Sequence, residues 1–171
     1  MQRSERHILG IDPGLHVTGY AVVAAANPGP RLVEAGVVRS EGADMPARLV
    51  SLHAGLAEIV AQFQPDVMVV EELYAHSEYP RTSILMGHAR GVLLLTAAQA
   101  GVPIVSYAST AIKKLVTGHG RASKEQMQQA IQREFGLAAP PDPPDVADAL
   151  ALALCHYFNE EAAAARRVAK P

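Results

Sequence analysis

The stretch His7-Ile-Leu-Gly-Ile-Asp12 decides the start of the fold, because it is a short apolar run that stops at Pro13-Gly14. Proline followed by glycine is a strong turn signal, so this run predicts a strand and then a hairpin turn. Two more valine-rich runs follow, at Val17–Ala24 and Arg31–Arg39, and a Pro- and Gly-rich turn separates them. Three strands in succession predict an antiparallel meander.

The middle of the chain alternates between helix and strand patterns. Apolar residues in Met45–Phe63 recur at three- and four-residue spacing, which indicates one buried stripe of a helix. The run Asp66–Glu71 is continuously apolar until its acidic end, as is typical of a strand buried on both faces. A long helix over Thr82–Ala100 and a fifth strand over Val102–Tyr107 are expected next.

Three further helices are predicted, from Ser109 or Thr110 to Val116, from Ser123 to about Phe135, and from near Pro144 to Phe158. Ser109 or Thr110 can cap the first, and Ser123 with Gln126 forms a capping box for the second. The expected fold is therefore α/β, a five-stranded mixed sheet with helices on both faces, in one domain over residues 1–158. Residues 159–171 show no core face, so we expect a frayed tail.

Composition narrows the function classes. With 171 residues, 49% hydrophobic and 19% charged, the chain is expected to fold as one compact domain and not as a disordered tail. Its single cysteine, Cys155, cannot form an internal disulfide, and residues 1–25 lack a secretory pattern. We therefore expect a cytoplasmic protein. No apolar run is long enough to span a bilayer.

The charge of the chain is segregated. The net charge is −2, which by itself argues against nucleic acid as a partner. Residues 79–124, however, contain no Asp or Glu and carry +6, so the remainder carries −8. A basic stretch that folds onto one face can bind a phosphate backbone. Its cations are Arg81, Arg90, Lys113, Lys114, Arg121 and Lys124.

Four carboxylates stand where strands end or a helix begins. Asp12 ends the first strand, Glu71 ends the fourth, and Asp145 and Asp148 lie one turn apart on the last helix. Ligand sites of open α/β sheets lie at such strand ends. Converging carboxylates repel one another without a cation, and oxygen ligands select Mg²⁺ or Mn²⁺. Two such ions about 4 Å apart support in-line attack at a phosphodiester.

Structural interpretations of these acids stay open. Asp12 can simply shape the turn before Pro-Gly, and Asp145 can simply favour a helix N-terminus. Glu71 is more informative, because a carboxylate buried without a partner is costly. Its neighbour Glu72 points to the opposite face, and the pattern alone does not choose between them.

Five segments in order carry a family resemblance. They are Gly10-Ile-Asp12-Pro-Gly14, Val70-Glu71-Glu-Leu-Tyr74, Gly87-His-Ala-Arg90-Gly91, Lys113-Lys-Leu-Val-Thr-Gly118-His-Gly120 and Asp145-Val-Ala-Asp148-Ala-Leu-Ala-Leu-Ala. Over about residues 7–158 the chain resembles the RuvC family of Holliday-junction resolvases. The resemblance implies an RNase H-like fold, a homodimer, and metal-dependent nicking of two opposed strands at a four-way junction, in recombination and DNA repair. A partnership with the RuvA–RuvB branch-migration complex is implied in the same way.

The resemblance also assigns roles. The catalytic, metal-holding acids of the family fall on Asp12, Glu71, Asp145 and Asp148, with Mg²⁺ or Mn²⁺, two ions per site, as cofactor. Glu71 is preferred over Glu72 because the family's glutamate stands three positions before an aromatic, here Tyr74. That aromatic stacks at the junction centre, although Tyr74 can instead cap the sheet.

Basic residues and glycines complete the expected site. The family's important lysines fall on Lys113 and Lys124, and Lys124 is expected to neutralise charge in the transition state. Lys113, Lys114, Arg121 and Arg81 are expected to follow the DNA phosphates, the alternative being an ordinary solvated helix face. Gly87 and Gly91 are the candidate dimer interface, although such residues also pack within one core. The loop 75–80 departs from the family pattern, so no cut-site preference is predicted.

Other functions remain possible at this stage. An RNase H-like nuclease that processes ribosomal RNA precursors shares the Ile-Asp-Pro-Gly opening and would cut RNA. A non-catalytic protein would bind junctions without nicking them. A kinase or actin-type domain also opens with Gly-Ile-Asp-x-Gly, but it needs two such domains, for which 171 residues are too few.

Overall fold

The computed structural model describes residues 5–73 and 80–168, which form one five-stranded mixed sheet with the strand order β3-β2-β1-β4-β5. Its strands are β1 (Arg6–Asp12), β2 (Val17–Ala25), β3 (Pro30–Arg39), β4 (Val67–Glu71) and β5 (Ile104–Tyr107). The first three pair antiparallel, and β4 and β5 run parallel to β1. The predicted mixed sheet and its antiparallel meander are confirmed.

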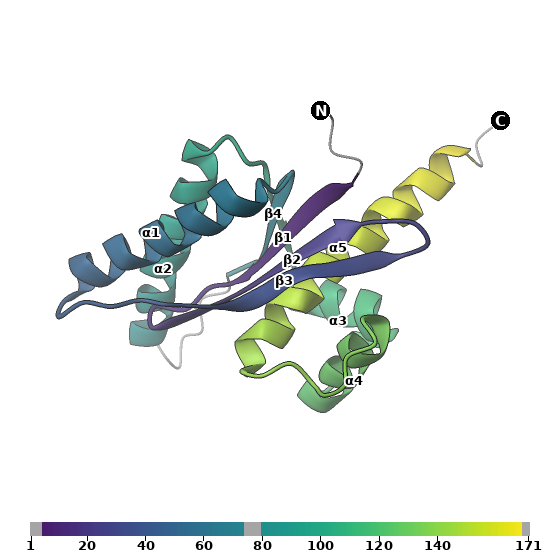
Figure 1. Ribbon diagram of the computed structural model, residues 1–171. Coiled ribbons are helices and arrows are strands. Elements are labelled where there is room, and N and C mark those ends of the chain that lie inside the picture. Colours follow the sequence, from purple (N-terminus) through teal and green to yellow (C-terminus); the bar gives the residue numbers. More distant parts are fainter. Residues whose placement is uncertain (1–4, 74–79, 169–171) are drawn as a thin grey trace.

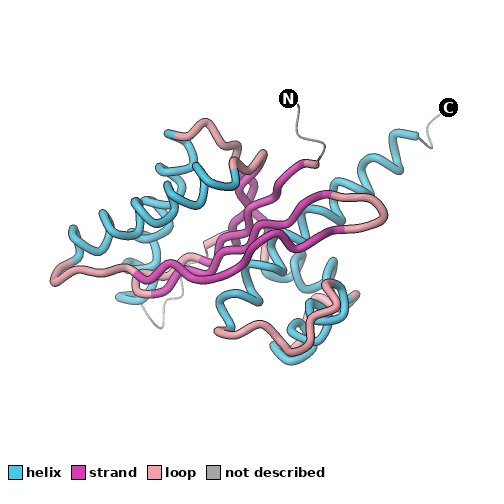
Figure 2. The backbone as a smooth tube through the Cα atoms, viewed as in Figure 1, coloured by secondary structure: helices cyan, strands magenta, loops and turns pink. Residues whose placement is uncertain are grey.

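Helices cover both faces of the sheet, as Figures 1 and 2 show. On one face lie α1 (Met45–Phe63) and α2 (Pro80–Gln99), and across the other runs α5 (Pro144–Val168). The short helices α3 (Ser109–Thr117) and α4 (Lys124–Glu134) pack beside α5. No helix in these described segments is both long and apolar enough to cross a membrane.

Alternation along the central strands builds two separate cores. In β4, Val67 and Val69 face the core under α5, whereas Met68 and Val70 face the core under α1 and α2. All four side chains are buried. The continuous apolar run that predicted a doubly covered strand is thereby explained, because each face of β4 needs its own apolar set.

Two strand glycines let α5 lie directly on the sheet. A Cβ atom added to Gly10 of β1 would stand 2.0 Å from the carbonyl oxygen of Ala149, and one added to Gly19 of β2 would stand 2.1 Å from that of Asp145. Both obstacles are backbone atoms of α5, so no rotamer change can relieve them. This close approach brings the start of α5 to the end of β1, where Asp12 pairs with Gly19.

Two helix starts test the expected boundaries. The capping box is confirmed, because Gln126 N–H donates to Ser123 Oγ at 3.3 Å and Ser123 N–H donates to Gln126 Oε1 at 2.8 Å. The cap expected for α3 is wrong: its N-cap is Ala108, which has no side-chain acceptor, and Ser109 is already the first helical residue.

The C-terminal tail is also corrected, since α5 continues to Val168 and does not end near Phe158. Alanine, glutamate and arginine dominate this stretch, and all three favour helix. Glu160 in it also accepts a hydrogen bond from Arg6 of β1 at 3.0 Å, which ties the extension to the sheet.

Candidate active site

The four predicted carboxylates meet at one edge of the sheet, and three elements supply them. Asp12 is the last residue of β1 and Glu71 the last residue of the neighbouring strand β4. Asp145 and Asp148 lie in the first two turns of α5. Glu71 continues the side of β4 that holds Val67 and Val69, so its side chain faces α5 and the other acids. The ambiguity between Glu71 and Glu72 is thereby resolved in geometry.

Asp12 carries the strongest electrostatic signature. Burial, together with the negative charges of Asp148, Asp145 and Glu71, raises the pKa of Asp12 from 3.8 to about 7, and only Lys124 opposes this shift. Burial and neighbouring negative charges both disfavour the ionised form of a carboxyl group, which is why its pKa rises. The four acids and Lys124 therefore share one electric field.

Asp148 shows the same effect more weakly. Loss of surrounding water raises its pKa, and Asp145 adds to the rise, whereas Lys124 and Lys113 lower it. The two lysines come from α4 and α3, so the positive side of the site is supplied by the helices that flank α5.

A cavity of about 190 Å³ lies beside Glu71, Asp148 and Lys124. Its polar lining includes a residue that sequence reasoning missed, Ser109, which was interpreted as a helix cap. Its apolar lining comes from α3, α4 and α5. The lining residues are Glu71, Ser109, Ile112, Lys113, Lys124, Met127, Asp148, Ala151 and Leu152.

The donor set fits a hard divalent cation. All four acids offer oxygen atoms, the ligand type that Mg²⁺ and Mn²⁺ prefer. Positive charge placed among them would relieve the repulsion that raises the pKa of Asp12. Across residues 5–73 and 80–168, no three His, Cys, Asp or Glu side chains are already grouped as a ligand set, so the acids would have to draw together around an ion.

Other predicted residues lie outside this cavity. Lys114 lies in the last turn of α3 and Arg121 in the connection to α4, and both are exposed. Arg81 is exposed at the start of α2, on the other face of the sheet. Tyr74 and residues 75–79 of the loop lie outside the described residues, so the predictions made for them stay untested.

Within residues 5–73 and 80–168, the two α2 glycines do not serve close packing. A Cβ atom added to Gly87 or Gly91 would meet no heavy atom within 4 Å beyond the local helix backbone. The described part of the chain therefore shows no close packing of these glycines within one core. They lie on an exposed part of the helix that includes Ile84 and Leu95, two residues that are 60% and 55% exposed.

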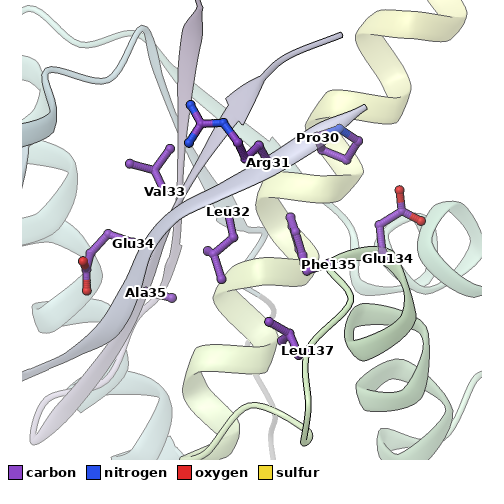
Figure 3. Close-up of a pocket in the computed structure, with 9 residues that line it drawn as sticks. All are labelled: Pro30, Arg31, Leu32, Val33, Glu34, Ala35, Glu134, Phe135 and Leu137. Carbon is purple, nitrogen blue, oxygen red and sulfur yellow. The ribbon is translucent and has the colours of Figure 1, made fainter. Parts of the chain in front are cut away.

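A larger hollow of about 520 Å³ lies elsewhere, between the edge strand β3 and the end of α4. Figure 3 shows Leu32 and Ala35 pointing toward Phe135 and Leu137, while Glu34 points away from them. No cluster of carboxylates converges there among the lining residues. Chemistry, and not cavity size, therefore identifies the candidate active site.

The fold and the site together define a class of protein, a carboxylate-based nuclease with an RNase H-like fold. Residues 8–156 match the family model described as "Crossover junction endodeoxyribonuclease RuvC". A crossover junction endodeoxyribonuclease RuvC from Rhodopirellula baltica is 51% identical over 88% of this chain and 85% of its own length. The chain belongs to the RuvC family, whose members are hydrolytic nucleases that depend on divalent metal ions.

Solved structures agree with this assignment. RuvC of Thermus thermophilus in complex with a Holliday junction substrate superposes with a TM-score of 0.85 at 32% identity, covering 92% of this chain and 96% of that one. The yeast mitochondrial Holliday junction resolvase Ydc2 superposes with a TM-score of 0.62 at 12% identity, covering 95% and 86%, and so shares the fold alone.

Proposed function

We propose that this chain resolves Holliday junctions by symmetric, metal-dependent nicking of two opposed DNA strands, in recombination and DNA repair in the bacterial cytoplasm. Residues 1–158 would form the nuclease domain. The observation that carries the proposal is the convergence of Asp12, Glu71, Asp145 and Asp148 beside Lys124 at the carboxyl edge of the sheet. Membership of the RuvC family supports the choice of a four-way junction as the substrate.

The chemistry is hydrolysis of one phosphodiester per strand. A water oxygen bonds to phosphorus, the bond from phosphorus to the 3′-oxygen breaks, and that oxygen takes a proton, which leaves 5′-phosphate and 3′-hydroxyl ends. Two Mg²⁺ or Mn²⁺ ions, when bound, supply activation of the water and stabilisation of the leaving oxygen. Asp12, Glu71, Asp145 and Asp148 would hold them, and Lys124 would offset the charge that develops on the phosphoryl oxygens.

The helices beside the site supply a route for the DNA backbone. Lys113 lines the cavity, and Lys114 and Arg121 continue the positive charge outward along α3 and its connection to α4. We propose that they contact phosphates, with Arg81 on a more distant segment and Tyr74 stacking on a base at the junction centre. Binding should therefore weaken steeply as salt rises.

A two-fold dimer would present two such sites to opposed strands. The exposed face of α2 that carries Ile84, Gly91 and Leu95 offers an apolar surface for the second copy, since these positions repeat at helical spacing. Gly91→Leu is expected to lower dimerisation in sedimentation velocity, because its side chain projects into this face. An unchanged dimer would place the interface elsewhere. A partnership with the RuvA–RuvB complex is proposed on the family relationship alone.

One assay tests the function. The protein is incubated with a labelled mobile four-way junction, a linear duplex and a structured RNA, each with Mg²⁺, Mn²⁺ or EDTA. Symmetric, metal-dependent nicks confined to the junction are expected. Junction binding without a nick under either metal would reject the proposal in favour of a binding protein, and cleavage of the RNA would favour an RNA-processing nuclease. Asp145→Asn should keep junction binding and lose nicking by at least about 100-fold.

A further inference from the structure

Arg90 reaches from α2 to the end of the catalytic strand. Its Nε donates to the main-chain carbonyl oxygen of Glu71 at 3.4 Å, and its Nη2 donates to Ser106 Oγ at 3.2 Å. Glu71 ends β4 and Ser106 lies in β5, so one guanidinium spans the two parallel strands at the edge where the acids stand. Arg90 lies on α2, which covers the face of the sheet opposite α5 (Figure 1).

The end of β4 needs such a contact. Glu71 is the last residue of the strand, where it pairs with Tyr107 of β5, and just beyond it the Glu72 N–H donates to Tyr107 O at 2.9 Å. A strand end held by few ladder bonds frays more readily than its middle. A charged donor on the Glu71 carbonyl restrains the peptide from which the Glu71 carboxylate projects.

We propose that Arg90 is a positioning residue, which fixes the last peptide of β4 so that the Glu71 carboxylate stays in reach of Asp12 and Asp148. The inference rests on the proposed function, because it assigns Glu71 a catalytic role. Arg90 thus differs in this proposal from Lys113, Lys114, Arg121 and Arg81, because its Nε and Nη2 are bonded to the protein. Arg90 stands between Gly87 and Gly91 in the sequence of α2. One turn of this helix therefore carries both the contact with the sheet and the proposed dimer face.

The test compares Arg90→Met, which keeps the aliphatic length but removes the donors, with Arg31→Met. Arg31 is a matched control, because it pairs with Glu5 at the opposite end of the sheet. Backbone hydrogen exchange of the Glu72 amide should accelerate about tenfold in Arg90→Met and stay unchanged in Arg31→Met. Single-turnover nicking of the junction should fall roughly 10- to 100-fold in Arg90→Met, with junction affinity in EDTA and the sedimentation coefficient unchanged.

The two readouts separate the possible failures. Faster exchange with unchanged nicking, or unchanged exchange, would overturn the role of Arg90. An equal loss of junction affinity and nicking would assign Arg90 to DNA binding and also overturn it. If the wild-type chain nicks no junction at all, the proposed function fails, while the exchange comparison still reports whether Arg90 holds the strand end. Ser106→Ala should give a smaller effect in the same direction, and adding it to Arg90→Met should change nothing further.

Discussion

The two faces of the sheet are packed in opposite ways. Under α1 and α2 the space is filled by large aliphatic side chains such as Leu52, Leu56 and Leu93, all fully buried. Under α5 the strands offer glycine at two points of contact, Gly10 and Gly19, and the helix backbone lies almost on the strands. One face keeps its helices at a distance set by side chains, and the other brings a helix as close as backbone atoms allow.

The close packing of α5 explains why the four acids gather on its face of the sheet. Carboxyl groups are short, so acids from two strands and a helix can share a cation only if the backbones that carry them come close. The glycine contacts put Asp145 and Asp148 beside Asp12, and burial at this contact contributes most to the raised pKa of Asp12. On the opposite face, the glycine of α1 nearest the sheet, Gly55, faces a side chain of β3, that of Val38, and Arg90 contacts the end of β4.

The largest effect is expected from adding one methyl group to the close face. Gly10→Ala places a Cβ 2.0 Å from the Ala149 carbonyl oxygen, so α5 must move, and the chain should lose about 3 kcal/mol or more of its unfolding free energy. Urea unfolding measures the loss, and nicking should fall as Asp148 moves away from Asp12. Gly29→Ala is the control, because its Cβ meets nothing within 4 Å and should change stability by less than about 0.5 kcal/mol. Equal stability of the two variants would contradict this account of the close face.

On the face under α1 and α2, truncating a buried side chain should lower the stability of the chain. Leu56→Ala leaves a cavity under α1 and should cost about 2 to 4 kcal/mol in urea unfolding. Because the acids stand on the other face, the folded variant should keep its single-turnover nicking rate within about twofold. If Leu56→Ala lost nicking at urea concentrations well below its unfolding transition, packing on one face of the sheet would be shown to affect the acids on the other.

A smaller effect, and an opposite sign, is expected at Asp12. Its pKa in the folded chain is about 7, above 3.8, so the metal-free protein loses this part of its stability as the pH rises from about 4 through about 7. Asp12→Asn removes that loss and should stabilise the chain in EDTA by about 2 kcal/mol at pH 8, with the gain shrinking toward pH 5.

Glu58→Gln, an exposed acid on α1, provides the matched control for this comparison and should show no such pH-dependent gain. Urea unfolding in EDTA at the two pH values measures both variants. A gain for Asp12→Asn that is as large at pH 5 as at pH 8 would argue against charge repulsion as its cause.

Local patterns were good predictors of the elements. The bounds of α1 are those that its apolar spacing predicted, and the capping box of α4 is present. Errors arose where a local pattern has two outcomes. Ser109 can cap a helix or begin one, and the alanine-rich tail can fray or continue α5, and here a contact between Arg6 and Glu160 accompanies the continuation.

Some residues of the candidate site were likewise indicated by local sequence patterns, and others were not. Short-range periodicity indicated that Asp145 and Asp148 share a side of a helix, and strand ends indicated Asp12 and Glu71. The open face beside Gly87 and Gly91, the position of Ser109 in the cavity and the reach of Arg90 to Glu71 depend on contacts between segments far apart in the chain. No periodicity within one segment records such contacts.

The sequence by itself determined the strands, most of the extent of the helices, the segregation of charge and the places of Asp12, Asp145 and Asp148, because these follow from spacing and residue type. Only the tertiary structure decided that α5 lies on Gly10 and Gly19, that Glu71 and not Glu72 faces it, and that Lys113 and Lys124 reach the same cavity. The physical reason is that repulsion among the acids and the field of the lysines depend on distance through space, which chain order does not specify.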